Sequence, residues 1–243
     1  MLANGHAPFD PRIFFKEART LEQAGYNVSL IIPHAKDEVK DNISLLAVPL
    51  TSKGWQKLTV NPWNILKRAL MQPSGAVYHI HDSDILVVGI VLKLLGRKVI
   101  YDAHEDTPLQ IMYQHWLPGI LKLPYRWFYF MLEKLCGLLF DRIIVAEPII
   151  ARYFPKKKTS LIRNFPIIGP FRLHKPVRFA ERKPRLVNIG TLSEVRGLLE
   201  MLDGAQLASG KANFEFVLGG KFSPPKLKEV LANYKVTFLS WVS

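Results

Sequence analysis

Four side chains that could do chemistry follow one another at the end of an apolar run. The segment "VYHIHDSD" begins at residue 77 and places His79, His81, Asp82 and Asp84 within six positions, after which the sequence turns apolar again. Imidazoles and carboxylates at this spacing can bind a metal ion, act as general acid or base, or cap the following helix. Because side chains two positions apart on a strand point to the same face, we expect both histidines on one side of a sheet.

A metal site and a general base make different demands on these histidines. Two histidines on one face can bind zinc, but the segment holds no further histidine, and His104 is the one plausible partner elsewhere. We therefore expect His79 to pack inside the fold and His81, nearer the strand end, to reach a cleft. There an imidazole that titrates near neutrality suits a general base for a hydroxyl. The alternative is a structural histidine whose ring is held by Asp82 or a backbone group.

The N-terminal segment "GHAPFDPRIFFKEA" carries a second group of polar residues, placed ahead of the first expected helix. Asp10 precedes Pro11, so it can cap a helix that has proline at its first position. A cap accounts for Asp10, but it does not account for His6 or Arg12.

Two glycine-containing segments later in the chain are suited to a phosphate. In "NIGTLSEVRGLLEML", residues 188–202, a strand is expected to run into a turn at Gly190 and then into a helix. The backbone N–H groups at that helix start can bind phosphate, and Arg196 adds a fixed positive charge. Gly219 and Gly220 allow a second close approach of backbone to ligand. Neither segment has the spacing of the dinucleotide fingerprint or a Walker loop, and two ordinary turns would have the same glycines.

The elements that position these residues alternate between strand and helix, with near-continuous apolar strands. This pattern predicts doubly wound parallel sheets of the α/β class. In such sheets ligands bind beyond the carboxyl ends of the strands, where all the polar groups above fall. Strands are expected first at 26–32, 43–50, 76–82, 98–105, 141–148 and 159–166, with helices at 12–25, 84–97, 109–140 and 149–155. A strand, a glycine turn and a helix then follow over 185–209, a strand and glycine turn over 214–222, a helix over 225–234 and a strand over 236–243.

Three segments are expected along the chain. These are an N-terminal Rossmann-like domain over 1–165, a basic, proline-rich linker over 166–184 and a partial C-terminal domain over 185–243. The last holds three strands, fewer than an independent α/β domain usually has, and its sheet would have an exposed edge. No strand is expected before the helix at residue 12. We interpret the chain as part of a longer protein, lacking a first strand and most of its second domain.

The charge of the chain restricts its partners. The 243 residues include 33 basic and 20 acidic ones, for a net charge of +13. A basic surface favours nucleic acid, an anionic membrane or a polyphosphate substrate. Eleven basic residues and one acidic residue fall in 148–185, where aromatic residues are few, and this argues against nucleic acid. The apolar stretch 117–140 holds too many charged residues to predict a spanning helix, and it suits either a membrane surface or a core helix.

The expected location follows from two further features. Cys136, the one cysteine, excludes an internal disulfide and fits a reducing compartment. The first residues show neither the basic nor the apolar region of a signal peptide. We expect a cytoplasmic protein that associates peripherally with the inner face of the membrane.

Taken in order over nearly the whole chain, these segments resemble the nucleotide-sugar glycosyltransferases of the two-Rossmann-domain (GT-B) class, and within them family 4. "PFDPRIFFKEARTLEQAGYNVSLI" is similar to that family's opening loop and first helix. "VYHIHDSDILVVGIVLKLLGRKVIYDAHED" is similar to its His-Asp-Pro-Glu-Leu and Tyr-Asp-x-His-Glu segments. "FDRIIVAEPIIARYF" and "LIRNFP" resemble the strands before the domain linker. "VNIGTLSEVRGLLEMLDGAQ", "FVLGG" and "VTFLSWVS" resemble the start of the donor-nucleotide domain.

The resemblance implies a role for each matching residue. It implies two Rossmann-like domains, the second truncated, with His81 as the catalytic residue beside the sugar in the cleft. The acceptor side would be lined by Asp10, Arg12, His104 and Glu105. The donor diphosphate would be bound by Gly190, Thr191, Arg196, Gly197, Gly219 and Gly220. No metal or other cofactor is expected, because basic side chains and a helix N-terminus stabilise the departing nucleotide diphosphate.

The chain departs from the family pattern at three places. Thr191 stands where the family often has Arg or Lys, so one diphosphate contact is in doubt. Asp84 replaces the glutamate of the His-Asp-Pro-Glu-Leu segment. The family's paired glutamates, which hold the donor sugar and ribose, would follow residue 243, so the donor site would be incomplete.

The function implied by the resemblance is that of a hexosyl- or other glycosyltransferase. It would move a sugar from a nucleotide-diphosphate-sugar to a hydroxyl of a sugar or lipid-linked sugar, in surface polysaccharide or glycolipid synthesis. Its partners would include an anionic membrane surface but no nucleic acid. Two alternatives remain: a sugar-nucleotide epimerase on the same fold, and a non-catalytic basic protein that binds membrane or nucleic acid.

Overall fold

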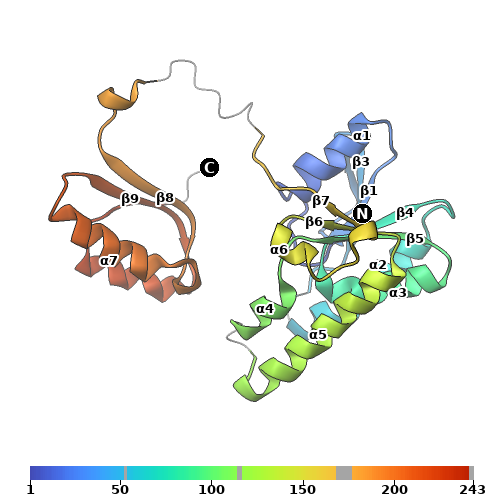
Figure 1. Ribbon diagram of the computed structural model, residues 1–243. Helices are drawn as coiled ribbons and strands as arrows, with labels where there is room; N and C mark the ends of the chain where they lie inside the picture. The colour runs from blue at the N-terminus through green and yellow to red at the C-terminus, as the bar shows by residue number, and fades with distance from the viewer. Residues whose placement is uncertain (52–53, 114–116, 168–176, 241–243) are drawn as a thin grey trace. The chain divides into compact units, whose positions relative to one another are not determined.

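The computed structural model describes residues 1–51, 54–113, 117–167 and 177–240. The chain divides into two compact units, Met1–Pro166 and Ile167–Ser243, each with parallel strands and helices (Figure 1). The predicted α/β class is therefore confirmed. Within the basic segment predicted as a linker, residues 168–176 lie outside the described residues, and Phe179–Glu181 forms one 3-10 turn, η5.

The first unit is built on two sets of hydrogen-bonded strands. The first set has the order β1-β3-β2 and the second the order β4-β5-β6-β7, and all neighbours are parallel except the antiparallel pair β2–β3. Every strand predicted here is present, with somewhat shorter bounds. The strands are β1 (Ser29–Pro33), β2 (Glu38–Lys40), β3 (Ile43–Val48), β4 (Val77–Ile80), β5 (Lys98–Ala103), β6 (Arg142–Val145) and β7 (Thr159–Leu161).

The first residues of the chain join the two sets of strands. Leu2 forms parallel bridges both to Ile31 of β1 and to Ile80 of β4. Its N–H donates to the His79 carbonyl at 2.7 Å, and the Ala3 N–H donates to the Ile31 carbonyl at 3.1 Å. A short bridging segment, which is not a full strand, therefore lies between β1 and β4, where no strand was expected. Three residues are too few to show the alternation by which a strand is recognised from sequence.

Helices connect these strands, and two of their features were not predicted. The helix α2 was missed because Pro62 lies inside it and interrupts the helical pattern. The first helix begins with a π-helical segment rather than a regular α-helix. The helical elements are η1 (Ile13–Ala18), α1 (Arg19–Gln23), α2 (Gly54–Leu70), η2 (Ser83–Ile85), α3 (Leu86–Leu94), α4 (Thr107–Met112), α5 (Gly119–Leu139), α6 (Pro148–Ala151) and η3 (Lys156–Lys158).

Apolar side chains cover both faces of the strands, as a doubly wound sheet requires. Leu30 and Ile32 of β1 pack with Phe14 of η1 in one buried cluster. Ile31, which lies between them and points to the opposite face, packs in a second cluster with residues of α2 and α3. Cys136 of α5 lies fully buried in that second cluster.

The second unit has one parallel sheet of order β10-β9-β8. β8 and β9 extend two residues beyond the glycines at which turns were expected, so Gly190 and Gly220 lie within strands and not in turns. The elements are β8 (Arg185–Leu192), η6 (Glu194–Arg196), α7 (Leu198–Ser209), β9 (Glu215–Phe222), η7 (Pro225–Asn233) and β10 (Thr237–Leu239). The last strand was predicted over 236–243, of which residues 241–243 lie outside the described residues.

Candidate functional site

The polar residues of the first unit meet where β4 and β5 end. These neighbouring parallel strands pair Ile80 with Tyr101, so the residues that follow each strand leave the sheet at the same edge. A small pocket of about 40 Å³ opens there. It is lined by His81, Asp82, Ser83, Tyr101, Asp102, His104, Glu105 and Thr107.

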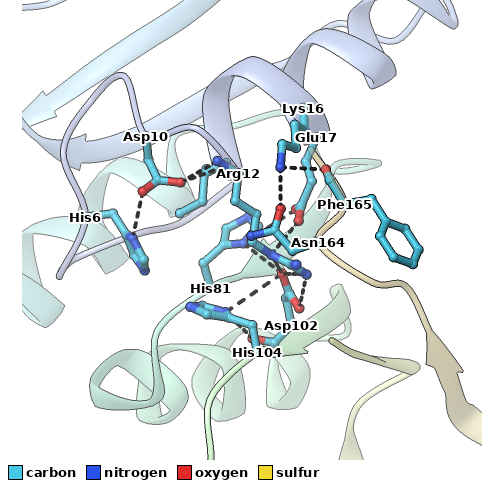
Figure 2. Close-up of polar contacts among 11 residues, drawn as sticks. His6, Asp10, Arg12, Lys16, Glu17, His81, Asp102, His104, Asn164 and Phe165 are labelled. Atoms are coloured by element: carbon cyan, nitrogen blue, oxygen red, sulfur yellow. Dashed lines mark hydrogen bonds and ion pairs between the residues drawn. The ribbon is translucent and has the colours of Figure 1, made fainter. Parts of the chain in front are cut away.

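A buried ion pair forms the floor of this site. Arg12, at the start of η1, donates from Nε and Nη2 to both carboxylate oxygens of Asp102, at 2.7–3.0 Å (Figure 2). Arg12 Nε also lies 2.9 Å from Glu17 Oε1. Burial by itself raises the pKa of Asp102, but the contact with His81 and the charge of Arg12 outweigh it and hold that pKa well below its usual range. Asp102 is therefore an anion that fixes Arg12 in the core.

His79 and His81 share one face of β4, as predicted, and their ring centroids lie 4.3 Å apart. His81 is among the residues that line the small pocket, but its side chain is fully buried. Its Nδ1 lies 3.5 Å from Asp102 Oδ2. The strand continues in the direction of the pocket, but the His81 side chain turns to the face covered by η1. Burial lowers the pKa of both imidazoles, which favours their neutral forms.

Asp82 and Asp84 do not cap the helix that follows them, although a cap was one of the roles that the sequence allowed. In the described residues, neither η2 nor α3 has a side-chain cap. Asp82 Oδ2 instead accepts from the backbone N–H groups of Asn4 and Gly5, at 2.6 and 3.1 Å. Asp84 Oδ2 accepts from the Asn4 side-chain amide at 2.6 Å. The two carboxylates therefore attach the N-terminal loop to the end of β4.

His6 lies between two carboxylates in that loop. Its Nδ1 is 3.3 Å from Asp10 Oδ2 (Figure 2), and its Nε2 is 3.3 Å from Asp82 Oδ1. The hydrogen bonds with Asp10 and then Asp82 raise the pKa of His6 to about 10, so it is a cation at neutral pH. Asp10 also accepts from the backbone N–H groups of Arg12 and Ile13, at 2.7 and 2.9 Å, so it fixes the start of η1 as expected of a cap.

Of the two histidines that line the small pocket, His104 has the more exposed side chain. Its side chain is 14% exposed, whereas that of His81 is 0% exposed. His104 Nδ1 lies 3.2 Å from the backbone carbonyl oxygen of Asp102. Because a carbonyl oxygen can only accept, this contact requires the proton on Nδ1 and leaves the Nε2 lone pair free to accept a proton. The neighbouring Glu105 is exposed.

A larger pocket of about 230 Å³ adjoins this edge of the sheet. Asp82, Ser83 and Thr107 line both pockets, so the two pockets are neighbours. Tyr125 and Tyr129 of α5 form part of its wall, with their hydroxyl oxygens 3.4 Å apart. The full lining is Leu58, Asp82, Ser83, Asp84, Thr107, Gln110, Ile111, Tyr125 and Tyr129. Carboxylates and tyrosines together suit a ligand with many hydroxyl groups.

The residues predicted to bind a donor lie in the second unit, and the structure brings two of them into contact. Gly190 of β8 and Gly220 of β9 stand opposite each other, with φ of 145° and 130°. A Cβ on Gly220 would lie 1.9 Å from the Gly190 carbonyl oxygen. Close packing of the two strands therefore explains why glycine occupies these positions. Gly219 is buried in β9, and Thr191 is exposed in β8.

Arg196 and Gly197 form a separate group at the start of α7. Arg196 ends the turn η6 and is exposed. Gly197 follows with φ of 72° and precedes the first residue of α7. This φ is left-handed, which glycine adopts at little cost. An exposed guanidinium beside a helix N-terminus is a favourable arrangement for an anion.

Sequence reasoning missed Glu17 and Asp102, although each left a signal. Glu17 falls four residues after Ile13 and four before Leu21, which places a carboxylate on the apolar stripe of the first helix. Asp102 is a carboxylate inside an otherwise apolar strand, where it is fully buried. A charged residue at such a position requires a buried partner, and Arg12 provides it.

The fold is that of several glycosyl-transferring and related proteins. Sucrose-phosphate synthase from Thermosynechococcus elongatus superposes with a TM-score of 0.69 at 17% identity, over 96% of this chain and 65% of its own. Anabaena HepE, solved with UDP and glucose, gives 0.65 at 11% identity, over 100% of this chain and 68% of its own. The lipopolysaccharide outer core galactosyltransferase WaaB gives 0.59 at 12% identity, over 100% and 66%. This chain thus spans about two thirds of the length of each.

At these identities the structural matches establish the GT-B fold and nothing finer. No curated protein matches the sequence significantly. A family profile does match, and it covers residues 12–165, which include Arg12, both strand-end segments and most of the first unit. The chain belongs to Glycosyltransferase Family 4.

Proposed function

We propose that this protein transfers a sugar from a nucleotide-diphosphate-sugar to a hydroxyl group, in the synthesis of a surface polysaccharide or glycolipid. The observation that carries the proposal is the polar edge of the first sheet. In a chain of Glycosyltransferase Family 4, that edge presents an accessible histidine of defined tautomer beside a pocket lined by carboxylates and tyrosines.

We assign the group that contacts the reacting sugar to His104 rather than to His81. His81 is buried and would have to leave the core to touch a substrate. His104 lies in the pocket lining, and its Nε2 can accept a proton from a hydroxyl. Arg12 and Asp10 position other residues of the site. Arg12 holds Asp102, whose backbone carbonyl orients His104. Asp10 orients the cation His6.

The acceptor is proposed to bind in the larger pocket of the first unit. Its volume of about 230 Å³ suits one sugar ring and its substituents. Asp82 and Asp84 can accept hydrogen bonds from sugar hydroxyls, and Tyr125 and Tyr129 offer aromatic surface. Glu105, exposed at the mouth of the smaller pocket, is a further polar contact on this side.

The donor diphosphate is proposed to bind at the start of α7. Arg196 supplies a fixed cation, and Gly197 lets the backbone turn into the helix, whose first N–H groups point to the ligand. Gly190, Gly219 and Gly220 keep β8 and β9 close and so position that helix start. Thr191 contributes a hydroxyl where a cation would be more effective. Charge neutralisation by these groups requires no metal for transfer.

An anionic membrane surface is the proposed location of the acceptor. α5 carries a stripe of exposed apolar residues at helical spacing, with Ile120 85% and Trp127 61% exposed. We call this the α5 stripe, and it consists of Ile120, Leu123, Trp127, Met131, Leu135 and Leu138. The exposed Arg126 adds positive charge beside it. In the described ranges, no helix is both long and apolar enough to cross a bilayer.

The proposal is tested by offering the purified protein a panel of nucleotide-diphosphate-sugars. We expect one of them to bind, and we expect Arg196→Ala to weaken that binding at least about tenfold, because one charge-assisted contact to phosphate is worth about 1.5–3 kcal/mol. Lys211→Ala, which removes an exposed cation elsewhere in the second unit, should leave the affinity unchanged. An epimerised nucleotide-sugar formed without acceptor would show an epimerase instead. Steeply salt-dependent DNA binding without any nucleotide-sugar effect would show a nucleic-acid-binding protein.

A further inference from the structure

Behind the pocket, four potential metal ligands converge from three elements. Glu17 comes from η1, His79 and His81 from β4 and its end, and Asp102 from β5. One ligand atom from each lies within 4.8 Å of every other. Glu17, His81 and Asp102 lie close together (Figure 2), and His81 and Asp102 also line the pocket that exposes His104.

Several polar atoms of this cluster are buried without a hydrogen bond. Among the described residues, no hydrogen-bond partner reaches Glu17 Oε2, His79 Nε2 or His81 Nδ1. His79 is 9% and His81 is 1% exposed, so bulk solvent does not reach these rings. A buried polar atom without a partner costs about 1–3 kcal/mol, and three of them pointing into one volume require an explanation.

Two of the distances between these atoms are close to those of ligands around one ion. His81 Nδ1 lies 3.5 Å from Asp102 Oδ2 and 3.7 Å from Glu17 Oε2. Both distances are too long for a good hydrogen bond. In a tetrahedral site with bonds of about 2.1 Å, neighbouring ligand atoms are about 3.4 Å apart. We propose that Glu17, His79, His81 and Asp102 bind one divalent transition-metal ion of the zinc class, with two nitrogen and two oxygen ligands.

The surroundings of the cluster are those of an outer ligand shell. Arg12 Nε forms an ion pair with Glu17 Oε1 at 2.9 Å. The other carboxylate oxygen, Oε2, is therefore left without a hydrogen bond and is directed at the cluster. It also holds Asp102 through both oxygens. Ligating carboxylates are commonly oriented by such hydrogen bonds. Burial favours the neutral imidazole for both histidines, and neutral imidazole is the form that binds metal.

The ion would have a structural role in this protein. It would tie η1 to β4 and β5 at the level of Arg12, directly beneath the residues that line the smaller pocket. It would hold its ligands in place rather than act on a substrate, because His79, His81 and Asp102 are buried and the side chain of Glu17 is only 20% exposed. The inference is therefore independent of the proposed transfer, and each can fail without the other.

The test is a zinc titration of the purified, chelator-treated chain in competition with a chromophoric chelator. We expect one zinc ion per chain, and we expect Glu17→Gln and His79→Gln each to weaken binding at least about tenfold, since even outer-shell changes cost 10–100-fold. Matched controls are His34→Gln and His104→Gln, which remove imidazoles outside the cluster and should leave zinc affinity unchanged.

A second measurement covers the case in which the variants do not fold. Cobalt(II) added to the unmutated chain should give the intense visible bands of a tetrahedral site, and added zinc should abolish them. Sub-stoichiometric zinc binding by the unmutated chain, or the weak spectrum of octahedral cobalt, would overturn the proposal. So would folded Glu17→Gln and His79→Gln variants that bind zinc as tightly as the unmutated chain.

Discussion

Arg12 and Asp102 form a bidentate ion pair in the core, although 90 positions separate them in the sequence. The pair connects the start of η1 with β5, directly below the strand ends that carry His104 and Asp82. Two charges at this depth are stable only because each satisfies the other. The geometry of the candidate site therefore depends on a contact between two buried side chains.

Removal of the Arg12 side chain should destabilise the folded protein. We expect Arg12→Ala to lower the free energy of unfolding by about 3–5 kcal/mol, because it leaves Asp102 buried and unpaired. Denaturant unfolding followed by tryptophan fluorescence measures the change. Arg19→Ala is the matched control, because its 3.8 Å pair with Asp41 is well exposed and should be worth only about 0–1 kcal/mol. Equal losses in the two variants would contradict the importance assigned to the buried pair.

The imidazolium of His6 should make stability depend on pH. The pKa of His6 is about 10 in the folded protein and near 6.5 in the unfolded chain. Its contribution is therefore fully present below pH 6.5 and is lost as the pH rises toward 10. We expect the difference in stability between the unmutated protein and His6→Gln to be largest below pH 6.5 and to vanish near pH 10. A difference that stays constant over that range would show that His6 is not charged.

The contact of Gly190 with Gly220 predicts opposite effects for two similar substitutions. Gly220→Ala places a methyl group 1.9 Å from the Gly190 carbonyl, at a φ of 130°, and should destabilise the second unit by about 3 kcal/mol. Gly204→Ala, in α7, meets no atom within 4 Å and should stabilise the unit by about 0.5–1 kcal/mol. Both changes in stability can be measured by hydrogen exchange of the β8 and β9 amides, which should be faster in Gly220→Ala and slower in Gly204→Ala. Slower exchange in Gly220→Ala would refute the predicted clash.

The α5 stripe should bind anionic lipid. We expect Trp127→Glu to reduce sedimentation with phosphatidylglycerol vesicles several-fold, because it removes an exposed aromatic anchor and adds a negative charge. Leu207→Glu, at a 77% exposed position on α7, makes a comparable change away from the stripe and should have no effect. Equal loss in both variants would point to net charge alone. Binding that neither variant reduces would exclude the stripe as the docking surface.

The sequence predicted the architecture well because the alternation of apolar strands and helices is local. It placed every strand of the second series and all but β2 and the Met1–Ala3 segment of the first. It also predicted that His79 and His81 share a face, because this follows from the period of a strand alone. The helix α2 was not predicted, because Pro62 inside it interrupts the helical sequence pattern.

The details of the site depend on contacts between distant segments, and these could not be predicted. His81 was expected in a cleft, but the direction of its face depends on η1, which covers it. A helix cap was one possible role for Asp82 and Asp84, but both carboxylates accept hydrogen bonds from Asn4 of the N-terminal loop instead. Gly190 and Gly220 were assigned to turns, and only their register across β8 and β9 shows that they allow close strand packing.

The most direct test of the central claim is the transfer itself. Purified protein is incubated with labelled nucleotide-diphosphate-sugar and a lipid-linked sugar acceptor on anionic vesicles, and glycosylated product is measured. We predict acceptor-dependent release of nucleotide diphosphate, and a fall in kcat of about 100-fold or more for His104→Asn, with His34→Asn as an unaffected control. No product with any donor that the protein binds, or an unchanged kcat in His104→Asn, would contradict the account.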